Sequence, residues 1–528
     1  MANAEHEGRI TRNAGVLVAL TTVSRVGGLI RETAISHYFG ASGLTDVFYM
    51  AFTIPNVMRR LVAEGTMTAV VQPAYQTVRT RDGDAAARRF YAGMLGWTLV
   101  AVLLLSVLGV LGAPALVTAF ASGFLDEPAK FAHCVELTRW LFPVVITMAL
   151  VGISMAVLNA HDVYAVPALA PIVLNISMIA FTIIGALTFP PEHRIMGAVV
   201  GVLVGGVVQV LVQAPALARL GLLARPRLSL EPAVKGALLK FVPGLFGLAV
   251  YQLNIIVLRQ LASYLDEGSV SYYNYADRLM EMAIGIFAIA IAQGSFTTMN
   301  EQAAGNRIEE LKGTWRFAMS LTNLIALPAA LGLGAIAVPI TSVLYLHGAF
   351  TWYDVQQTAS AALAFAPGLV AMSGTRATAQ VFYALGDQRT PVVVSAFVLV
   401  SNLLIGVALL SYGVAGLALT LSLSSFIQTG LLVLLLRRKI GDLHTEKFVR
   451  PVALQALLSC IAVAAAYGVQ RFGDWPRGLT PTNVVVLGVA VSAAMAIYGG
   501  GALLCKLEGV EQVAGGLTRR LRRVFGRR

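Results

Sequence analysis

The stretch "AGVLVALTTVSRVGGLIRETAISHYF", residues 14–39, is long and apolar enough to cross a bilayer, yet it carries Arg25, Arg31 and Glu32. A hydrocarbon core of about 30 Å takes roughly 20 apolar residues in a helix. A charged side chain at the centre of that core costs at least about 2.5–3.5 kcal/mol. The stretch therefore predicts a membrane helix whose charged side chains face protein or a cavity and not lipid.

The rest of the chain continues this apolar pattern. Of its 528 residues, 57% are hydrophobic and 12% are charged, and the mean hydropathy is +0.74, which is far from the composition of a soluble domain. The pattern predicts an all-α polytopic membrane protein with about 14 transmembrane helices. The predicted spans are 13–38, 45–66, 91–120, 137–160, 166–189, 195–219, 241–264, 271–298, 315–345, 355–384, 391–411, 413–436, 451–470 and 482–505.

The placement of Lys and Arg between these spans predicts their orientation. With the N-terminus inside, the inner segments hold 27 of the 39 basic residues and the outer loops hold five. Cytoplasmic loops are the ones that retain positive charge. Both termini are therefore predicted to be cytoplasmic, and the net charge of +12 reflects this bias and does not indicate a nucleic-acid partner.

Two halves of the sequence follow the same plan. "VLNAHDVYAVPALAPIVLNISMI" (157–179) and "FYALGDQRTPVVVSAFVLVSNLLI" (382–405) each run from a helix end through Asp and Pro into a helix containing Asn, and their aspartates are 225 residues apart. "FYMAF" (48–52) and "YYNYA" (272–276) are 224 apart. We predict two six-helix lobes, arranged as parallel repeats around a central cavity, plus a C-terminal helix pair. The predicted divisions are an N-terminal lobe at 1–222, a C-terminal lobe at 223–440, the helix pair at 441–507 and a basic cytoplasmic tail at 508–528.

One predicted helix carries a face of glycines. Gly197, Gly201 and Gly205 recur every four residues, so they lie on one side of the helix. Such a face allows another helix to approach closely. We predict that it packs against a neighbouring helix, and we consider a ligand cradle the weaker interpretation.

The basic residues inside the predicted spans are all arginines. Arginine remains charged at physiological pH and binds oxyanions such as phosphate through two hydrogen bonds. Arg25 and Arg31 lie about 120° apart around their helix, and neither has an obvious partner within it. The seven are Arg25, Arg31, Arg59, Arg60, Arg259, Arg278 and Arg376.

Two of these arginines and their neighbours suggest different roles. Arg278 is preceded by Asp277 and reaches Glu281 at i+3, which predicts partial neutralisation. Arg60, by contrast, pairs with Glu64 at i+4, and we predict structural roles for it and for Arg259 and Arg376. An anionic ligand is the economical explanation for the others. Gly27, Gly28 and Pro55 are predicted hinges, because helices bend at such residues.

Motifs for other chemistry are missing from the sequence. Cys134, Cys460 and Cys505 are scattered, and the seven histidines form no metal-binding motif. No Walker loop, dinucleotide fingerprint or nucleophile elbow occurs in a suitable context. We therefore predict a transporter and not an enzyme, with no metal and no cofactor.

Five segments taken together resemble a known family. They are "SRVGGLIRETAISHYFGASGLTDVFYMAFTIPNVMRRLVAEG" (24–65), "YYNYADRLMEM" (272–282), "HGAFTWYDV" (347–355) and the two repeat segments. They resemble the MurJ (MviN) lipid II flippases of the multidrug/oligosaccharidyl-lipid/polysaccharide (MOP) exporter superfamily. The resemblance implies 14 helices and a substrate, the undecaprenyl-diphosphate-linked peptidoglycan precursor. It also implies transfer of this lipid from the inner to the outer leaflet of the bacterial cytoplasmic (inner) membrane.

The resemblance also implies roles for individual residues. The family's cavity arginines match Arg25, Arg31, Arg59 and Arg278, which would bind the diphosphate. Cavity or gating acids are expected among Glu32, Asp46, Glu64, Asp277 and Glu281, with Glu32 standing where the family commonly has aspartate.

The resemblance further implies how the lipid would move. The lipid tail is expected along a groove of the last two helices while the lobes alternate between inward and outward openings, driven by the membrane potential or by a coupling ion. The expected partners are lipid II, membrane lipids and the peptidoglycan synthesis machinery, with no nucleic acid.

Three alternatives remain open on the sequence. Another MOP-type exporter, of lipid-linked saccharides or drugs, would share the fold. A membrane glycosyltransferase would need acidic catalytic residues on a sizeable outer loop, and the outer loops here are short. A scaffold of the wall-synthesis machinery is compatible with any membrane fold.

Overall fold

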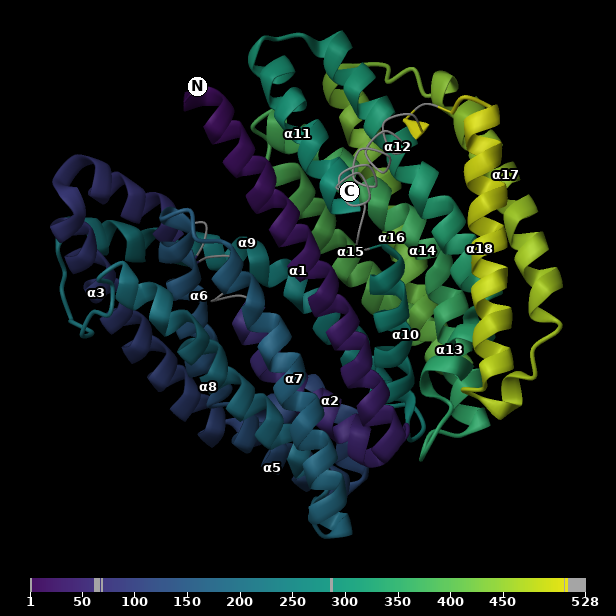
Figure 1. Cartoon of the computed structure of the whole chain (residues 1–528), viewed down its shortest axis with the longest axis horizontal. Helices are drawn as coiled ribbons and strands as arrows, with labels where there is room; N and C mark the ends of the chain where they lie inside the picture. Colours follow the sequence, from purple (N-terminus) through teal and green to yellow (C-terminus); the bar gives the residue numbers. More distant parts are fainter. Residues whose placement is uncertain (1, 61–66, 68–69, 285–287, 508, 511–528) are drawn as a thin grey trace, which may run out of the picture. The chain divides into compact units, whose positions relative to one another are not determined.

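The structure is a computed structural model that describes residues 2–60, 67, 70–284, 288–507 and 509–510, and no strand occurs within those ranges (Figure 1). The chain divides into two compact units. The first comprises Met1–Ser271 with Gly348–Phe350, and the second comprises Tyr272–His347 with Thr351–Arg528. Each unit is built only of helices and the turns that connect them.

The first unit begins with the long helix α1 and alternates long helices with short ones. Pro114 and Pro128 stand in the first turns of α4 and α5, where the missing amide of proline costs no hydrogen bond. The helices of this unit are α1 (Ala2–Phe39), α2 (Gly43–Arg59), α3 (Gln72–Leu111), α4 (Ala113–Phe120), η2 (Ser122–Asp126), α5 (Pro128–Leu141), α6 (Val144–Ala160), α7 (Ala165–Thr188), η3 (Pro191–His193), α8 (Met196–Arg219) and α9 (Pro232–Ala262).

The second unit contains nearly all of α10 and the helices that follow it. Thr351 caps α14 by accepting from the amide of Asp354, whose carboxylate in turn accepts from the amide of Thr351. The helices are α10 (Ser269–Ile284), α11 (Ala288–Ala304), α12 (Ile308–Ala335), α13 (Ala337–Tyr345), α14 (Trp352–Ala384), α15 (Arg389–Ala408), η4 (Leu410–Tyr412), α16 (Gly413–Ile440), α17 (Glu446–Gln470), η5 (Trp475–Arg477) and α18 (Pro481–Leu504).

The predicted membrane architecture is confirmed. Within the described ranges, ten helical segments are long and apolar enough to cross a membrane. The count of 14 stays a prediction. The four other predicted spans, 13–38, 45–66, 241–264 and 271–298, are the first two of each half, and they include most of the buried arginines.

The predicted repeat is confirmed by the order in which helices pack. In the first unit α3 packs on α6, α6 on α8 and α7 on α8; in the second, α12 packs on α14, α14 on α16 and α15 on α16. Helices α4 and α13 begin at Ala113 and Ala337, and α6 and α14 end at Ala160 and Ala384, so both pairs are 224 residues apart. Each unit thus buries an apolar core around its third, fourth and sixth predicted spans.

A turn at the end of α6 and of α14 fixes the alignment of the repeat. Asp162 and Gly386 have positive φ angles of 60° and 74°. The next amides, of Val163 and Asp387, donate to the carbonyl five residues earlier, at 2.9 and 2.8 Å. Asp162 therefore corresponds to Gly386. The sequence alignment of Asp162 with Asp387 was wrong by one residue, because the same turn tolerates aspartate or glycine at its left-handed position.

The glycine face of α8 packs against α7, as predicted. A Cβ on Gly197 would lie 2.4 Å from the carbonyl oxygen of Phe181, and one on Gly201 would lie 2.8 Å from Met178 Cα. Ser177 Oγ donates to the carbonyl of Gly201 at 2.9 Å. The two backbones are therefore closer than any side chain at these positions would allow.

We expect Gly201→Ala to lower the free energy of unfolding by about 1–3 kcal/mol, because the new Cβ would force α7 and α8 apart. The measurement is the midpoint of thermal unfolding in detergent. Gly236→Ala in α9 is the matched control, since nothing lies within 4 Å of the added Cβ. A Gly201→Ala protein as stable as Gly236→Ala would contradict the packing.

Candidate functional site

The centre of α1 carries a buried ion pair. Arg31 is 8% exposed and Glu32 1% exposed. Arg31 Nη2 donates to Glu32 Oε1, and Arg31 Nη1 donates to Asn175 Oδ1 on α7 at 3.0 Å. The expectation that Arg31 has no partner within its own helix was wrong, because the long guanidinium arm bends back onto the neighbouring carboxylate.

Two further residues complete this polar cluster, which we define as Ser24, Arg31, Glu32, Tyr49 and Asn175. Tyr49 on α2 donates from its hydroxyl to Glu32 Oε2 at 2.6 Å. Asn175 Nδ2 donates to the backbone carbonyl of Ser24 at 2.9 Å. The cluster joins α1, α2 and α7, and each charge in it meets both an opposite charge and a neutral hydrogen-bond partner.

The three predicted hinge residues lie within helices. Gly27 and Gly28 are part of α1, and a Cβ on them would lie 3.4 and 3.8 Å from Asn175 Nδ2. Their small size therefore lets Asn175 approach the backbone of α1. Pro55 is buried within α2. The hinge role of all three stays a prediction.

Asp46 stands in the first turn of α2 and is 1% exposed. Its carboxylate accepts from the amides of Gly268 and Ser271 at 2.7 and 2.9 Å and from Ser271 Oγ at 2.7 Å. Lys130 Nζ lies 3.9 Å away. All of these residues belong to the first unit, so Asp46 binds together segments that are far apart in its sequence.

Arg25 and Arg59 are partly buried residues of the first unit. Arg59 Nε donates to Asn56 Oδ1 at 2.8 Å, which fixes the start of its guanidinium. Directly after Arg59 the α-helix gives way to π-helical hydrogen bonding, which occurs at Arg60 and at 67, 70 and 71. Such turns are frequent at functional sites. Glu64 and the tail 511–528 lie outside the described residues.

The second unit contains the remaining predicted site residues, all on α10. Arg278 Nη1 donates to Glu281 Oε2 at 2.6 Å, so the predicted i+3 pair is confirmed. Arg278 and Asp277 are partly buried. Tyr272, one and a half turns earlier, donates from its hydroxyl to Asp354 Oδ1 at 2.7 Å and so fixes α10 to the start of α14.

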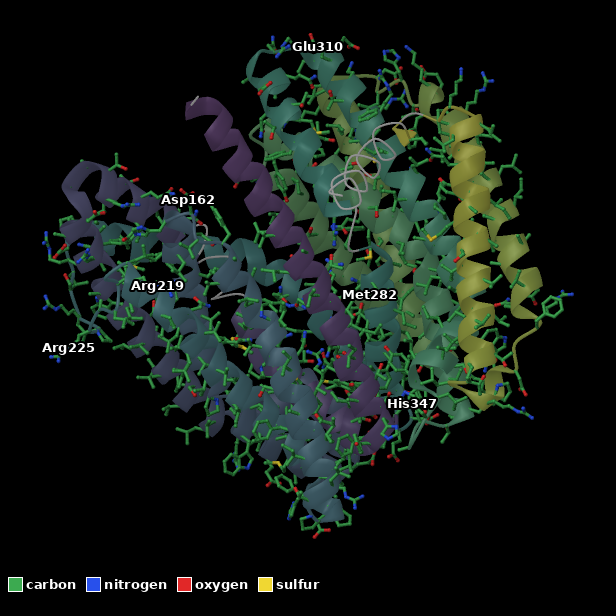
Figure 2. All side chains as sticks on the ribbon, in the orientation of Figure 1. Asp162, Arg219, Arg225, Met282, Glu310 and His347 are labelled. Atoms are coloured by element: carbon green, nitrogen blue, oxygen red, sulfur yellow. The ribbon has the colours of Figure 1, made fainter. Side chains whose placement is uncertain are left out.

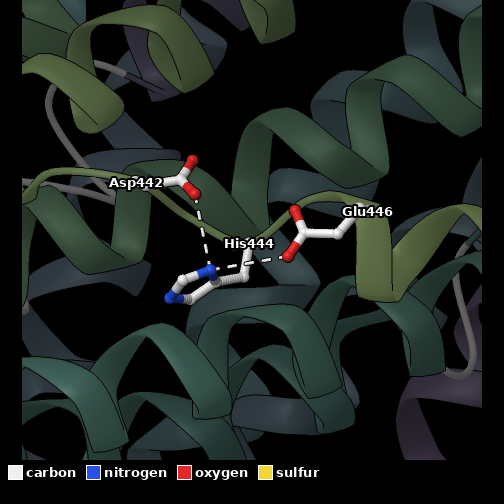
Figure 3. A group of neighbouring side chains, drawn as sticks. All are labelled: Asp442, His444 and Glu446. Atoms are coloured by element: carbon white, nitrogen blue, oxygen red, sulfur yellow. Dashed lines mark ion pairs between the residues drawn. The ribbon is translucent and has the colours of Figure 1, made fainter.

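A surface histidine cluster lies on the connection from α16 to α17 (Figure 3). His444 Nδ1 is 3.4 Å from Asp442 Oδ2 and 3.4 Å from Glu446 Oε1, and His444 Nε2 is 3.9 Å from Glu309 Oε2. Exposed ion pairs of this kind contribute about 0–1 kcal/mol each. Imidazole and carboxylate groups also occur as metal ligands, and the predicted lack of a metal site stays a prediction.

Sequence reasoning missed Asn175 and Tyr49 as partners of the ion pair. The available signal was that Asn175 is a polar amide inside the apolar run "PIVLNISMI" (171–179), and buried amides need partners. Tyr49 gave no signal, because a tyrosine among apolar residues is typical of any helix core.

We expect Asn175→Leu to lower the free energy of unfolding by about 2–3 kcal/mol, because it leaves Arg31 Nη1 and the carbonyl of Ser24 without the amide. Thermal unfolding in detergent measures the change. Thr182→Val on the same helix is the matched control: Thr182 is fully buried, and its hydroxyl has no hydrogen-bond partner in the described part of the chain. Equal midpoints for the two variants would show that the Asn175 contacts contribute nothing.

Comparisons with known proteins extend over most of the chain. The family model described as "Lipid II flippase MurJ" matches residues 35–486. A protein of Burkholderia cenocepacia named "Lipid II flippase MurJ" is 35% identical over 431 residues, covering 79% of this chain and 82% of its own. A Vibrio cholerae protein named "Probable lipid II flippase MurJ" is 32% identical over 501 residues, covering 91% and 94%.

Solved structures share the fold. A structure titled "Lipid II flippase MurJ, inward closed conformation" matches with a TM-score of 0.76 and 21% identity, covering 92% of this chain and 98% of that one. An inward-facing MATE transporter of the MOP superfamily matches with a TM-score of 0.61 and 16% identity, covering 81% and 94%. From its match to the family model and its similarity to these relatives, the chain belongs to the MurJ family of lipid II flippases.

Proposed function

We propose that this chain moves lipid II, the undecaprenyl-diphosphate-linked peptidoglycan precursor, from the inner to the outer leaflet of the bacterial inner membrane. The observation that carries the proposal is family membership over most of the chain, at an identity that includes the segments with the arginines. The family is one of transporters, so the chain transports and is not expected to catalyse. We infer that both termini are cytoplasmic from the positions of the basic residues.

The diphosphate is the part of lipid II that the buried arginines suit. A guanidinium binds phosphate oxygens through two charge-assisted hydrogen bonds. Arg25 and Arg59 of the first unit and Arg278 of the second are each partly buried, which combines low dielectric with some access. We assign these three to the diphosphate.

Arg31 has a different place in this proposal. Its charge is compensated by Glu32 and it is more deeply buried than the other three arginines. We infer that Arg31 holds α1 in the shape that positions Arg25, and that it supports the site without being its main ligand.

The C-terminal helix pair suits the lipid tail. In the apolar window of α18 only 6% of residues are buried, and in that of α17 only 22%. Such helices present apolar side chains to lipid along most of their length. We propose that the tail remains along this pair while the head group crosses. An inside-negative potential would favour outward transfer by about 2.3 kcal/mol per negative charge per 100 mV; a coupling ion is a further possibility.

The test is complementation of a bacterium depleted of its lipid II flippase, with outer-leaflet lipid II measured directly. We expect rescue by the wild type, and at least about a tenfold loss of exposed lipid II with Arg25→Ala, Arg59→Ala or Arg278→Ala, since a charge-assisted contact contributes about 1.5–3 kcal/mol. Arg31→Ala should also fail, but with a lowered thermal midpoint, because Glu32 is left buried beside only Tyr49. Arg25→Ala should keep its midpoint.

Arg225→Ala is the matched control. Arg225 is exposed, lies in the connection between α8 and α9, and stands at the edge of the first unit (Figure 2). Its variant should rescue like the wild type. Rescue by all four buried-arginine variants would overturn the diphosphate site, and a wild type that is present in the membrane but does not rescue would favour another exporter of the superfamily.

A further inference from the structure

Helix α14 contains an interrupted step at its centre. Pro367 lies in the interior of this 33-residue helix. Proline has no amide hydrogen, so the carbonyl of Leu363 lacks its usual partner four residues on. Pro367 and Leu363 both lie on the exposed face of the helix. The next step of the helix joins the carbonyl of Ala364 to the amide of Gly368.

A hydroxyl from another helix binds both ends of that next step. Ser422 on α16 donates from Oγ to the carbonyl oxygen of Ala364 at 2.6 Å, and the same Oγ accepts from the amide of Gly368 at 3.1 Å. A hydroxyl can do both, because it has one donor and two acceptor positions. Insertion of a side chain into the hydrogen bonds of a helix is a recognised cause of bending.

The surroundings of Ser422 are shaped for this bridge. A Cβ at position 368 would lie 2.7 Å from Ser422 Oγ and 3.0 Å from Ser422 Cα, so glycine is required for the approach. Ser422 is 1% exposed, so solvent does not compete for the two backbone groups. Proline, glycine and serine thus act together at one level of the helix pair.

The first unit has a break at the equivalent place. A shift of 224 residues relates Pro367 to Pro143. There the span is divided: α5 ends at Leu141, α6 begins at Val144, and the amides of Val145 and Ile146 donate to carbonyls three residues back, each at 3.1 Å. Ser422 corresponds to Ala198, which has no hydroxyl. The same level of the repeat is therefore divided in one unit and bridged in the other.

The two parts of α14 are attached to different helices. Before the step, Asp354 accepts from Tyr272 of α10, the helix that carries Arg278. After the step, Thr429 of α16 donates to the carbonyl of Ala371 at 2.7 Å and lies 2.7 Å from Thr375 Oγ1. A change of angle at the step would therefore move the first part with α10 while the second part stays with α16.

We propose that the Ala364–Gly368 step is a hinge of α14 and that the Ser422 hydroxyl makes it usable. When the step opens, the hydroxyl keeps both backbone groups hydrogen-bonded, whereas an unbridged opening would leave them unsatisfied in an apolar environment, which is strongly unfavourable. The hinge is a property of the second unit and does not depend on which cargo the protein moves.

Hydrogen–deuterium exchange of the full chain in lipid nanodiscs tests the hinge. We expect Ser422→Ala to slow exchange of the amides at 364–372 by at least about fivefold, because opening then loses one net hydrogen bond. Ser425→Ala is the matched control: this buried serine lies on the same helix, and its hydroxyl donates to the carbonyl of Leu421 at 2.7 Å, within α16 itself. It should exchange like the wild type. Unchanged or faster exchange in Ser422→Ala would overturn the proposal.

Pro367→Ala provides a second variant that is not expected to harm folding, since alanine is the best helix former. It restores the amide that can bond to Leu363, so exchange at 364–372 should again be slower. The distance distribution between nitroxide labels at Tyr353 and Tyr383, two exposed positions near the ends of α14, should become narrower. An unchanged exchange rate and an unchanged distribution would overturn the hinge even if Ser422→Ala did not fold.

Discussion

The buried pair of Arg31 and Glu32 is the interaction on which the first unit depends. An apolar helix that keeps two full charges at its centre is stable only if protein groups replace water around both of them. Tyr49 and Asn175 supply those groups, from α2 and α7. Since α7 in turn lies directly against the glycine face of α8, the positions of four helices follow from satisfying one ion pair.

Asp46 obeys the same constraint by other means. Its charge is met by two backbone amides and a hydroxyl, with Lys130 farther away. Amides do not titrate and have fixed positions, so this carboxylate holds a loop in place more rigidly than a lysine or arginine side chain would. The first unit therefore contains one charge held by flexible side chains and another held by backbone.

Local and periodic properties of the sequence predicted much of the fold. Apolar length gave the membrane helices, spacing gave the glycine face and the Arg278–Glu281 pair, and similarity between segments gave the repeat. Contacts between distant residues could not be predicted in this way. Asn175 is 144 residues from Arg31 and Ser271 is 225 from Asp46, and no local pattern records such partners. The role of the four site arginines is likewise a matter of long-range geometry.

The bridged step of α14 and the divided span at Pro143 differ, at the position that faces them, by serine on α16 and alanine on α8. In the genetic code these two amino acids are separated by a single-base change in the first codon position. Two copies of one architectural element can therefore diverge from a permanent bend to a hydroxyl-bridged one within one mutational step. Internal symmetry of this kind makes unequal halves accessible to selection without any change in topology.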